Sequence, residues 1–182
     1  AANPPDRCYF CKKALFTQIK ALAEKMEIQQ VVDGSNLDDE RDYRPGMQAL
    51  AELEIKSPLR IVQLTKDEIR TLSQMLSLPT WDKPSFACLA SRIPYGEPIT
   101  KEKLAMIEKA ELFLMAQGFK QMRVRCHDKL ARIEVPEEDI PVLLNSEMRK
   151  KIADAFAKIG FTYTAIDIKG YRTGSMNEAL KK

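Results

Sequence analysis

The spacing of apolar side chains in the first part of the chain predicts helices that alternate with short strands. Over residues 9–26 apolar side chains recur every third or fourth position, which is the period of an amphipathic helix. Residues 28–34 then predict a strand that ends in a polar loop, and a second strand is expected over 60–62. Thr65 and Glu68 form a capping-box pattern at the start of another helix. This alternation predicts βα units on a parallel sheet.

The second part of the chain follows a segment rich in proline and has a different pattern. Prolines and a glycine between positions 77 and 100 exclude a long helix or a central strand there, so we place a domain boundary after residue 85. A helix is expected over 100–117, and residues 121–127 alternate apolar and polar side chains as a strand does. An antiparallel partner at 130–135, a helix at 147–159 and a strand at 162–168 complete a small α+β domain.

Composition and charge narrow the class of protein. Of the 182 residues, 45% are hydrophobic and 30% are charged, the balance of an ordinary folded chain. The net charge of +3 is far from the dense basic field of a protein that binds mainly nucleic acid. No apolar run approaches the roughly 18 residues that a bilayer span needs. We therefore expect neither a nucleic-acid partner nor a membrane partner. Four cysteines without a secretory signal favour a reducing compartment, so we expect a cytoplasmic protein.

The cysteines are the most specific chemical feature. Cys8 and Cys11 form a CxxC motif at the start of the first predicted helix, which suits a metal, a cluster or redox chemistry, unless they are two small apolar residues. Cys88 lies near Arg92 in an irregular segment, a setting that favours a thiolate, although a buried apolar cysteine is an equal alternative. Cys126 shares the apolar face of its strand and is predicted to lie in the core.

Charged side chains on the predicted hairpin suggest an anion site. Arg123 and Arg125 lie on one face of their strand, and two such guanidinium groups can bind one phosphate or carboxylate, although a solvated strand face has equal weight. The loop at 33–39 suits magnesium or a nucleotide, or is an ordinary polar loop. His127, in the predicted turn, has no second ligand at metal spacing and is expected to face solvent.

Three segments together closely resemble one family of enzymes. Residues 3–12 (NPPDRCYFCK), 33–46 (DGSNLDDERDYRPG) and 84–96 (PSFACLASRIPYG) resemble the LarE family of ATP-dependent sulfur transferases, within the PP-loop ATP pyrophosphatase superfamily. The resemblance implies an α/β fold: part of a Rossmann-like parallel-sheet domain at 1–85 and a small α+β domain at 86–182. It also implies that ATP and magnesium adenylylate a carboxylate of pyridinium-3,5-biscarboxylic acid mononucleotide before sulfur is installed. The products are the thiocarboxylates of the nickel pincer cofactor.

The same resemblance assigns roles to individual residues. Cys88 corresponds to the cysteine that handles sulfur, either by giving up its own sulfur and leaving dehydroalanine or by binding a 4Fe-4S cluster together with Cys8 and Cys11. Substrate and phosphate ligands are implied at seven further positions: Ser91, Arg92, Glu111, Arg123, Arg125, Glu134 and Arg172.

One motif of the superfamily is missing from the sequence. PP-loop enzymes hold pyrophosphate with an SGGxDS loop, yet this chain has no adjacent glycines and does not begin with Met. We therefore expect that the first part of the nucleotide-binding domain is absent and that the chain alone does not adenylylate. We also expect a homo-oligomer. Two alternatives remain at this point: a zinc-containing PP-loop enzyme that acts on RNA or a deazapurine, and a non-enzymatic binding module stabilised by metal.

Overall fold

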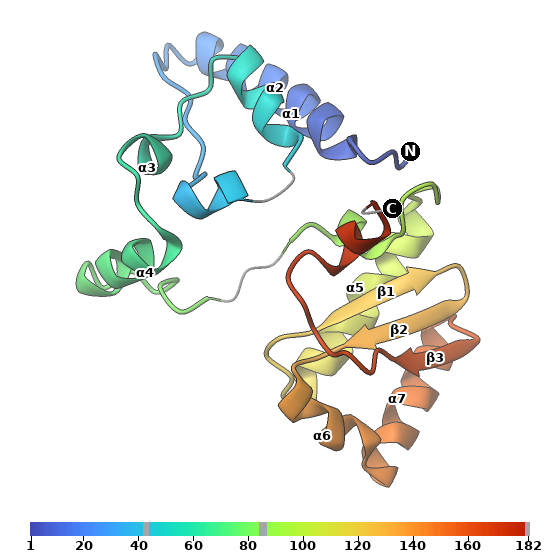
Figure 1. Ribbon diagram of the computed structural model, residues 1–182. Helices are drawn as coiled ribbons and strands as arrows, with labels where there is room; N and C mark the ends of the chain where they lie inside the picture. The colour runs from blue at the N-terminus through green and yellow to red at the C-terminus, as the bar shows by residue number, and fades with distance from the viewer. Residues whose placement is uncertain (42–43, 84–86, 181–182) are drawn as a thin grey trace. The chain divides into compact units, whose positions relative to one another are not determined.

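The computed structural model describes residues 1–41, 44–83 and 87–180. The chain divides into two compact units (Figure 1). Unit 1 consists of Ala1–Asn3 and Pro84–Lys182, and unit 2 of Pro4–Lys83. In the described part of the chain, no helix is both long and apolar enough to cross a membrane.

Unit 2 is built mainly from helices. It contains α1 (Arg7–Lys25), the 3-10 helix η1 (Leu37–Arg41), α2 (Gly46–Glu52), α3 (Pro58–Ile61) and α4 (Lys66–Met75). The helix predicted over 9–26 is confirmed as α1, and the predicted capping box at the start of α4 is present. Helix α2 packs closely on α1 because its first residue is a glycine: a Cβ at Gly46 would lie 2.9 Å from Lys12 Cδ and 3.3 Å from the Cys8 carbonyl oxygen.

The strand predicted over 60–62 is wrong. These residues fall at α3 and its C-terminal end, and Pro58 is the first helical residue, where its fixed φ suits the helix and its missing N–H costs nothing. In the described residues of unit 2 the expected parallel sheet is reduced to one parallel bridge between Val32 and Lys56. The backbone N–H of Asp33 donates to the Lys56 carbonyl at 2.9 Å beside this bridge.

Unit 1 is a mixed α/β structure around a three-stranded sheet. Its strands are β1 (Arg123–His127), β2 (Leu130–Glu134) and β3 (Tyr163–Ile166), with β1 antiparallel and β3 parallel to β2. The predicted hairpin and third strand are therefore confirmed. The helices are η2 (Leu89–Arg92), α5 (Lys101–Ala116), η3 (Glu137–Asp139), α6 (Ile140–Leu144), α7 (Ser146–Ile159) and η4 (Ser175–Leu180).

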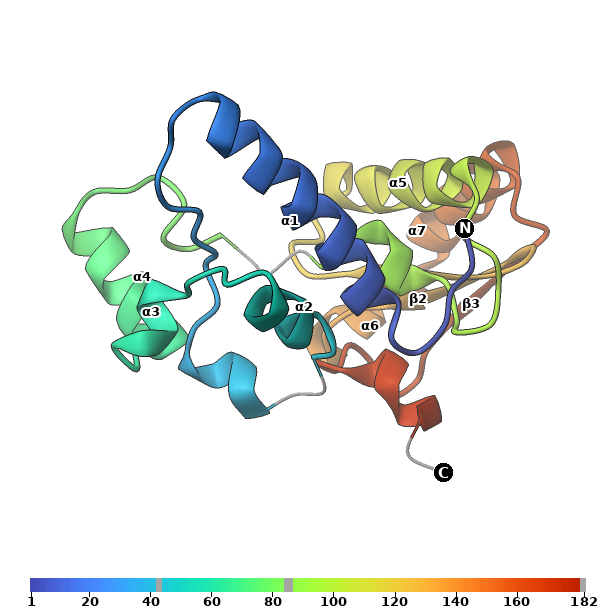
Figure 2. The same ribbon diagram turned by 90° about the horizontal axis from the view of Figure 1, so that it is seen from above.

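The two faces of the sheet differ sharply. One face presents Val124, Cys126 and Ile133 to α5 and α7 and forms the hydrophobic core, so the prediction that Cys126 lies in the core is confirmed. We call the other side the polar face; its strand residues are Arg123, Arg125, Arg132 and Glu134. The C-terminal segment, defined here as residues 167–180, lies on this second side, whereas α5 and α7 lie on the first (Figure 2).

The first residues of the chain are part of unit 1. The backbone nitrogen of Ala1 donates to the Ile99 carbonyl at 2.7 Å, and the Ile99 N–H donates to the Ala1 carbonyl at 2.9 Å. The buried Asn3 amide donates to the carbonyls of Ile93 and Pro94 at 3.1 and 2.7 Å. These bonds fasten the segment that links η2 to α5.

Candidate functional site

The loop that carries Cys88 is held in place by hydrogen bonds from the side chain of Arg92. Cys88 is an exposed free thiol at the residue before η2, so the alternative of a buried apolar cysteine is wrong. The Arg92 side chain is 1% exposed. Its Nη1 donates to the carbonyls of Ala87 and Cys88 at 2.8 and 3.1 Å and to Ser91 Oγ at 2.9 Å. Arg92 therefore fixes the backbone on which the thiol is presented.

Glu111 completes the support of this loop from α5. Its two carboxylate oxygens accept from Arg92 Nε and Nη2 at 2.8 and 2.9 Å, which is a bidentate pair. Glu111 Oε1 also accepts the backbone N–H of Val124 at 2.9 Å. Because both partners are buried, loss of either would leave an uncompensated charge at a cost of about 3–5 kcal/mol.

Arg125 forms a second buried pair, on the polar face itself. Its Nε and Nη2 donate to the two oxygens of Glu134 at 2.9 and 2.7 Å. Arg125 also donates to the Ser91 carbonyl at 2.8 Å and to Ser175 Oγ at 2.7 Å, which joins η2, the sheet and the C-terminal segment. The alternative of a solvated strand face is wrong at Arg123 and Arg125, which are both buried because the C-terminal segment covers this side.

Arg123 is the neighbour of these pairs. Its guanidinium carbon lies 5.1 Å from the centre of the Tyr171 ring, a cation–π contact, and its Nη1 donates to the Met122 carbonyl at 2.6 Å. Burial, followed by the nearby positive charge of Arg92, holds the pKa of Arg123 below its ordinary value. A bound anion would therefore stabilise the charged form of the Arg123 guanidinium.

The outer part of the polar face has a more exposed network. Asp167 follows β3 and pairs with Arg132, and its Oδ1 lies 3.6 Å from Arg172 Nη1. Arg132 also lies 3.2 Å from Glu134, and Arg172 donates to Glu178 at 3.0 and 3.3 Å. Burial alone would raise the pKa of Asp167, but the backbone N–H of Lys169 and the two arginines outweigh it and hold that pKa below its usual value.

Sequence reasoning missed two members of this face. Asp167 and Ser175 were not predicted, although both bind arginines that were. A carboxylate near the end of the strand predicted at 162–168 was an available signal for Asp167. Ser175 had no such signal, because its role depends on how the C-terminal segment returns to the sheet.

The expectation that His127 faces solvent is wrong. His127 is the last residue of β1, on the same strand face as Arg123 and Arg125, and its side chain is half-buried. Among the described residues its Nε2 is buried without a hydrogen-bond partner. Burial, followed by the charge of Arg132, lowers the pKa of His127 below its ordinary value.

The CxxC cysteines lie in the other unit. Cys8 is half-buried and Cys11 is exposed, both as free thiols in the first turns of α1, three residues apart and therefore neighbours on the helix surface. Three accessible or partly accessible thiols, with Cys88, are the donor chemistry that an iron–sulfur cluster requires. Within each unit, the described residues contain no group of three or more His, Cys, Asp or Glu side chains arranged as a metal site.

Asp33, from the loop considered for magnesium, is bound within unit 2. Its oxygens accept from Ser57 Oγ at 2.5 Å and Ser35 Oγ at 2.6 Å, and Lys12 Nζ lies 3.3 Å away. Burial opposes ionisation of Asp33, but these hydrogen bonds outweigh it and lower the pKa. In this structure the carboxylate ties α1 to the loop before α3.

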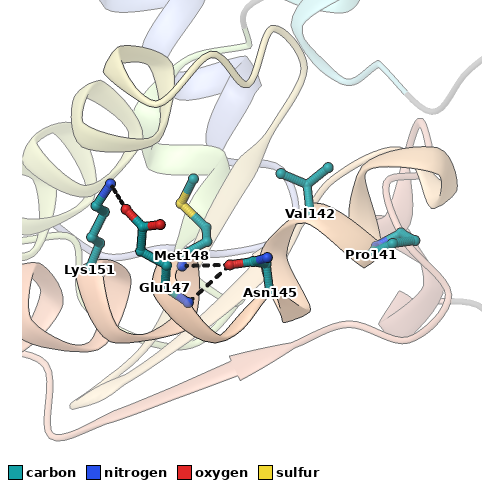
Figure 3. A pocket seen from close by; sticks show the side chains of 6 residues that line it. All are labelled: Pro141, Val142, Asn145, Glu147, Met148 and Lys151. Atoms are coloured by element: carbon teal, nitrogen blue, oxygen red, sulfur yellow. Dashed lines mark hydrogen bonds and ion pairs between the residues drawn. The ribbon is translucent and has the colours of Figure 1, made fainter.

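A groove of about 430 Å³ lies at the junction of α6 and α7 in unit 1 (Figure 3). Its polar groups bind one another: Asn145 Oδ1 accepts the backbone N–H groups of Glu147 and Met148 at 2.9 and 3.4 Å, and Lys151 pairs with Glu147 at 2.7 Å. None of the predicted site residues lines it. The polar face, with the Cys88 loop at its edge, is the stronger candidate site.

Comparison with known proteins identifies the family. No protein-family model matches the chain. An uncharacterized protein of Synechocystis sp. is 46% identical over 181 residues, which cover 100% of this chain and 68% of that protein. The pyridinium-3,5-bisthiocarboxylic acid mononucleotide synthase of Lactiplantibacillus plantarum is 35% identical over 182 residues, 99% of this chain and 64% of the synthase. An uncharacterized protein of Methanocaldococcus jannaschii is 34% identical over 94% of this chain and 66% of its own length.

These matches extend over nearly the whole chain, so the chain belongs to the same family as these proteins, a LarE-like family. It spans about two thirds of the length of each relative.

Proposed function

We propose that this protein takes part in ATP-dependent sulfur transfer to the carboxylates of pyridinium-3,5-biscarboxylic acid mononucleotide, in synthesis of the nickel pincer cofactor. The observation that carries the proposal is the 35% identity, over 99% of this chain, to a protein named for the corresponding bisthiocarboxylic product. The exposed Cys88 beside an arginine-lined face gives it chemical support, because sulfur transfer to an anionic mononucleotide needs a thiol and cations together.

Cys88 is the proposed sulfur donor. Its thiolate attacks a carboxylate activated as an acyl adenylate, the C–S bond forms and AMP leaves. Removal of the Cα proton then breaks the bond between Cβ and sulfur, which leaves dehydroalanine at position 88 and a thiocarboxylate on the substrate. In this scheme Arg92 and Glu111 position the Cys88 loop, since their charged groups are already paired with each other.

The alternative source of sulfur uses Cys8 and Cys11 as well. The three thiols of Cys8, Cys11 and Cys88 would hold a 4Fe-4S cluster, which supplies an open iron that carries the sulfur to be donated. Under this form of the proposal Cys88 is a ligand and stays intact. The free state of all three thiols is compatible with either form.

The substrate is proposed to bind on the polar face. Ser91, Arg123, Arg125 and Arg172 supply hydroxyl and guanidinium groups there, and Glu134 orients Arg125. Guanidinium groups bind phosphate and carboxylate through paired N–H donors. The proposed mononucleotide substrate has both a phosphate and carboxylates. Arg172, the partly exposed guanidinium at the edge of this face, contacts the substrate first.

Activation by ATP and magnesium is proposed for the complete gene product. The relatives are longer than this chain by about a third of their length, and an SGGxDS loop in such a part would hold the pyrophosphate. The described residues of unit 2 bury only four apolar side chains. The unit therefore has exposed apolar surface against which a further segment could pack. On this proposal residues 1–182 alone do not adenylylate.

The test is to incubate the complete gene product anaerobically with ATP, Mg²⁺ and the mononucleotide, then detect thiocarboxylate and the peptide that contains Cys88 by mass spectrometry. A Cys88 peptide lighter by the mass of hydrogen sulfide supports sacrifice of the cysteine. An intact peptide with bound iron that Cys8→Ser removes supports the cluster. Cys88→Ser should abolish product, and Cys126→Ala, which removes a core thiol, should not. Full activity of Cys88→Ser would overturn both forms.

A further inference from the structure

The first turns of α1 carry two thiols at a spacing that a disulfide can bridge. Cys8 is the second residue of the helix and Cys11 the fifth, and both are free. Cα atoms three residues apart on an α-helix are roughly 5 Å from each other, inside the range of about 4.4–6.8 Å that a disulfide spans. The spacing therefore meets the backbone requirement for a bond between the two cysteines.

The side chains have to come closer than a regular α-helix holds them. Cβ atoms three residues apart on a helix are about 5–6 Å from each other, whereas a disulfide needs about 3.5–4.5 Å. A 3-10 turn is tighter and superimposes positions i and i+3. The start of α1 already has two hydrogen bonds of this kind. The Arg7 N–H donates to the Pro4 carbonyl at 3.0 Å, and the Tyr9 N–H donates to the Asp6 carbonyl at 2.8 Å.

The two cysteines differ in how firmly they are held. The backbone of Cys8 packs against α2, since a Cβ at Gly46 would lie 3.3 Å from the Cys8 carbonyl oxygen. Cys11 is exposed, so its side chain can rotate toward Cys8 without leaving a packed position. Asp6, which precedes the helix, makes no side-chain cap bond that a tighter first turn would break. Movement of Cys11 and of the first turn is thus enough to close the bond.

The other two cysteines are less suitable partners. Cys126 lies in the core of unit 1, and burial raises the pKa of its thiol, which makes it unreactive toward a disulfide. Cys88 is exposed, but it belongs to the other unit and has no second cysteine near it in sequence. A bond between Cys8 and Cys11 closes a loop with only two intervening residues, and short loops lose the least entropy on closure.

We propose that Cys8 and Cys11 form a reversible disulfide by exchange with a low-molecular-weight disulfide, and that this bond withdraws the pair from metal binding. One protein thiolate attacks the small disulfide, which gives a mixed disulfide and releases one small thiol. The second protein thiol then attacks the protein sulfur of the mixed disulfide and releases the other small thiol. The protein pair gives up two electrons and two protons, and the small disulfide takes up both.

The disulfide has a consequence for the cluster form of the proposed function, and this consequence rests on that proposal. Oxidation removes two of the three proposed ligands, Cys8 and Cys11, and leaves Cys88 without its thiol partners. Only the reduced pair is free to bind iron, because the ligand of a metal is the thiolate. The redox state of the surrounding thiol pool then decides whether α1 can supply metal ligands.

The experiment equilibrates residues 1–182 anaerobically with reduced and oxidised glutathione at a series of ratios, then blocks free thiols with iodoacetamide. Trypsin releases residues 8–12 as one peptide, so the disulfide is detected by mass spectrometry as an unlabelled peptide that lacks two hydrogens. Because the second step is intramolecular, the pair should be half oxidised at roughly tenfold less oxidised glutathione than half-modifies Cys88. Cys88→Ser should leave this midpoint unchanged.

Cd²⁺ tests the withdrawal from metal binding, because this thiophilic cation reports on paired thiolates. In the Cys88→Ser variant, oxidation of the pair should lower the affinity for Cd²⁺ at least about tenfold. Equal affinity of the reduced and oxidised forms would overturn this part of the proposal.

Cys11→Ser combined with Phe10→Cys is the matched control. It moves the second thiol by one position, to an exposed site whose side chain does not face Cys8. This variant should need roughly tenfold more oxidised glutathione for the same conversion, and equal conversion would overturn the role given to the helix geometry. A pair that stays reduced at every ratio, a mixed disulfide as the final product, or a bond to Cys88 would overturn the proposal. The titration uses neither ATP nor substrate, so failure of the sulfur-transfer assay and failure of the disulfide are separate results.

Discussion

At the scale of single residues, the buried arginines act through what they are bonded to. Arg92 and Arg125 each give a bidentate pair to one carboxylate and further bonds to backbone carbonyls or hydroxyls. Such pairs are not a general source of stability, but a single buried partner without the other is strongly unfavourable. Both side chains thus help to hold the structure around Cys88 in place.

Glu111→Gln tests how strongly the buried charge of Arg92 depends on its carboxylate partner. We expect the free energy of unfolding to fall by about 3–5 kcal/mol, because Arg92 would keep its buried charge without the opposite one. Urea unfolding followed by circular dichroism measures it. Glu147→Gln removes one partner of an exposed pair on α7 and should change little. The double variant Arg92→Met/Glu111→Leu should recover most of the loss; no recovery would mean that the pair matters for reasons other than charge.

His127 predicts a pH dependence. Burial lowers its pKa below the ordinary value of about 6.5, so the folded chain binds this proton less readily than the unfolded chain. The stability that follows is present above about pH 6.5 and is lost as the pH falls toward the lowered value. Since His127 is the only histidine, its ring proton resonance gives the pKa directly by NMR. His127→Gln should remove this part of the pH dependence; an ordinary pKa for His127 would contradict the explanation.

Residue positions were predictable where periodicity alone decides them. Strand alternation placed Cys126 in the core and put Arg123 and Arg125 together on the opposite face. The same alternation also puts His127 on that face, but its position beside the turn suggested solvent. Arg125 is bonded to Ser175 of the C-terminal segment, and no local pattern specifies how that segment returns to the sheet.

At the scale of elements, the C-terminal segment reaches the polar face through a close backbone approach. Gly170 has φ +64°, and a Cβ there would lie 2.8 Å from the Val135 carbonyl oxygen. The next residue, Tyr171, donates its N–H to that same carbonyl at 2.7 Å. Only a glycine allows the chain to turn at this point and stay bonded to the end of β2.

Gly170→Ala should therefore displace the C-terminal segment. We expect a loss of about 1–3 kcal/mol in the free energy of unfolding and faster hydrogen exchange over 168–180. Gly174→Ala is the matched control: Gly174 also has positive φ, at +76°, but has open space around its Cβ position. If both variants cost the same, the contact with Val135 contributes nothing and only the backbone conformation matters.

Helices with long periodic patterns and clear caps were predictable, whereas the short elements were not. The period over 9–26 and the capping box at Thr65 correspond to α1 and α4. The apolar residues at 60–62 suggested a strand because a short apolar run fits either element, and Pro58 decided it as a helix start. The parallel sheet expected for this region needs partner strands, and the described residues supply one bridge.

At the scale of the whole molecule, the core is divided unequally. Fifteen buried apolar residues form one cluster in unit 1, while the buried apolar residues described in unit 2 are four: Ala23, Ala49, Leu50 and Ile55. In the described part of the chain twenty large apolar side chains are exposed, and thirteen of them lie in unit 2. Apolar burial is the main favourable term in folding, so unit 2 is expected to be less stable against unfolding than unit 1.

This division predicts two unfolding transitions for residues 1–182. Amides of α1, α2 and α4 should exchange faster and at lower urea concentration than those of β1 and β2, as measured by hydrogen-exchange mass spectrometry across a urea series. A single transition with one midpoint for both units would contradict the prediction. If the gene encodes a longer product, that product is the informative comparison: a further segment that packs on the apolar side chains of α4 would move the unit 2 transition to higher urea while that of unit 1 stays. An unmoved unit 2 transition would instead mean that those side chains remain uncovered, which would weaken the proposal that the nucleotide-binding part is built on this unit.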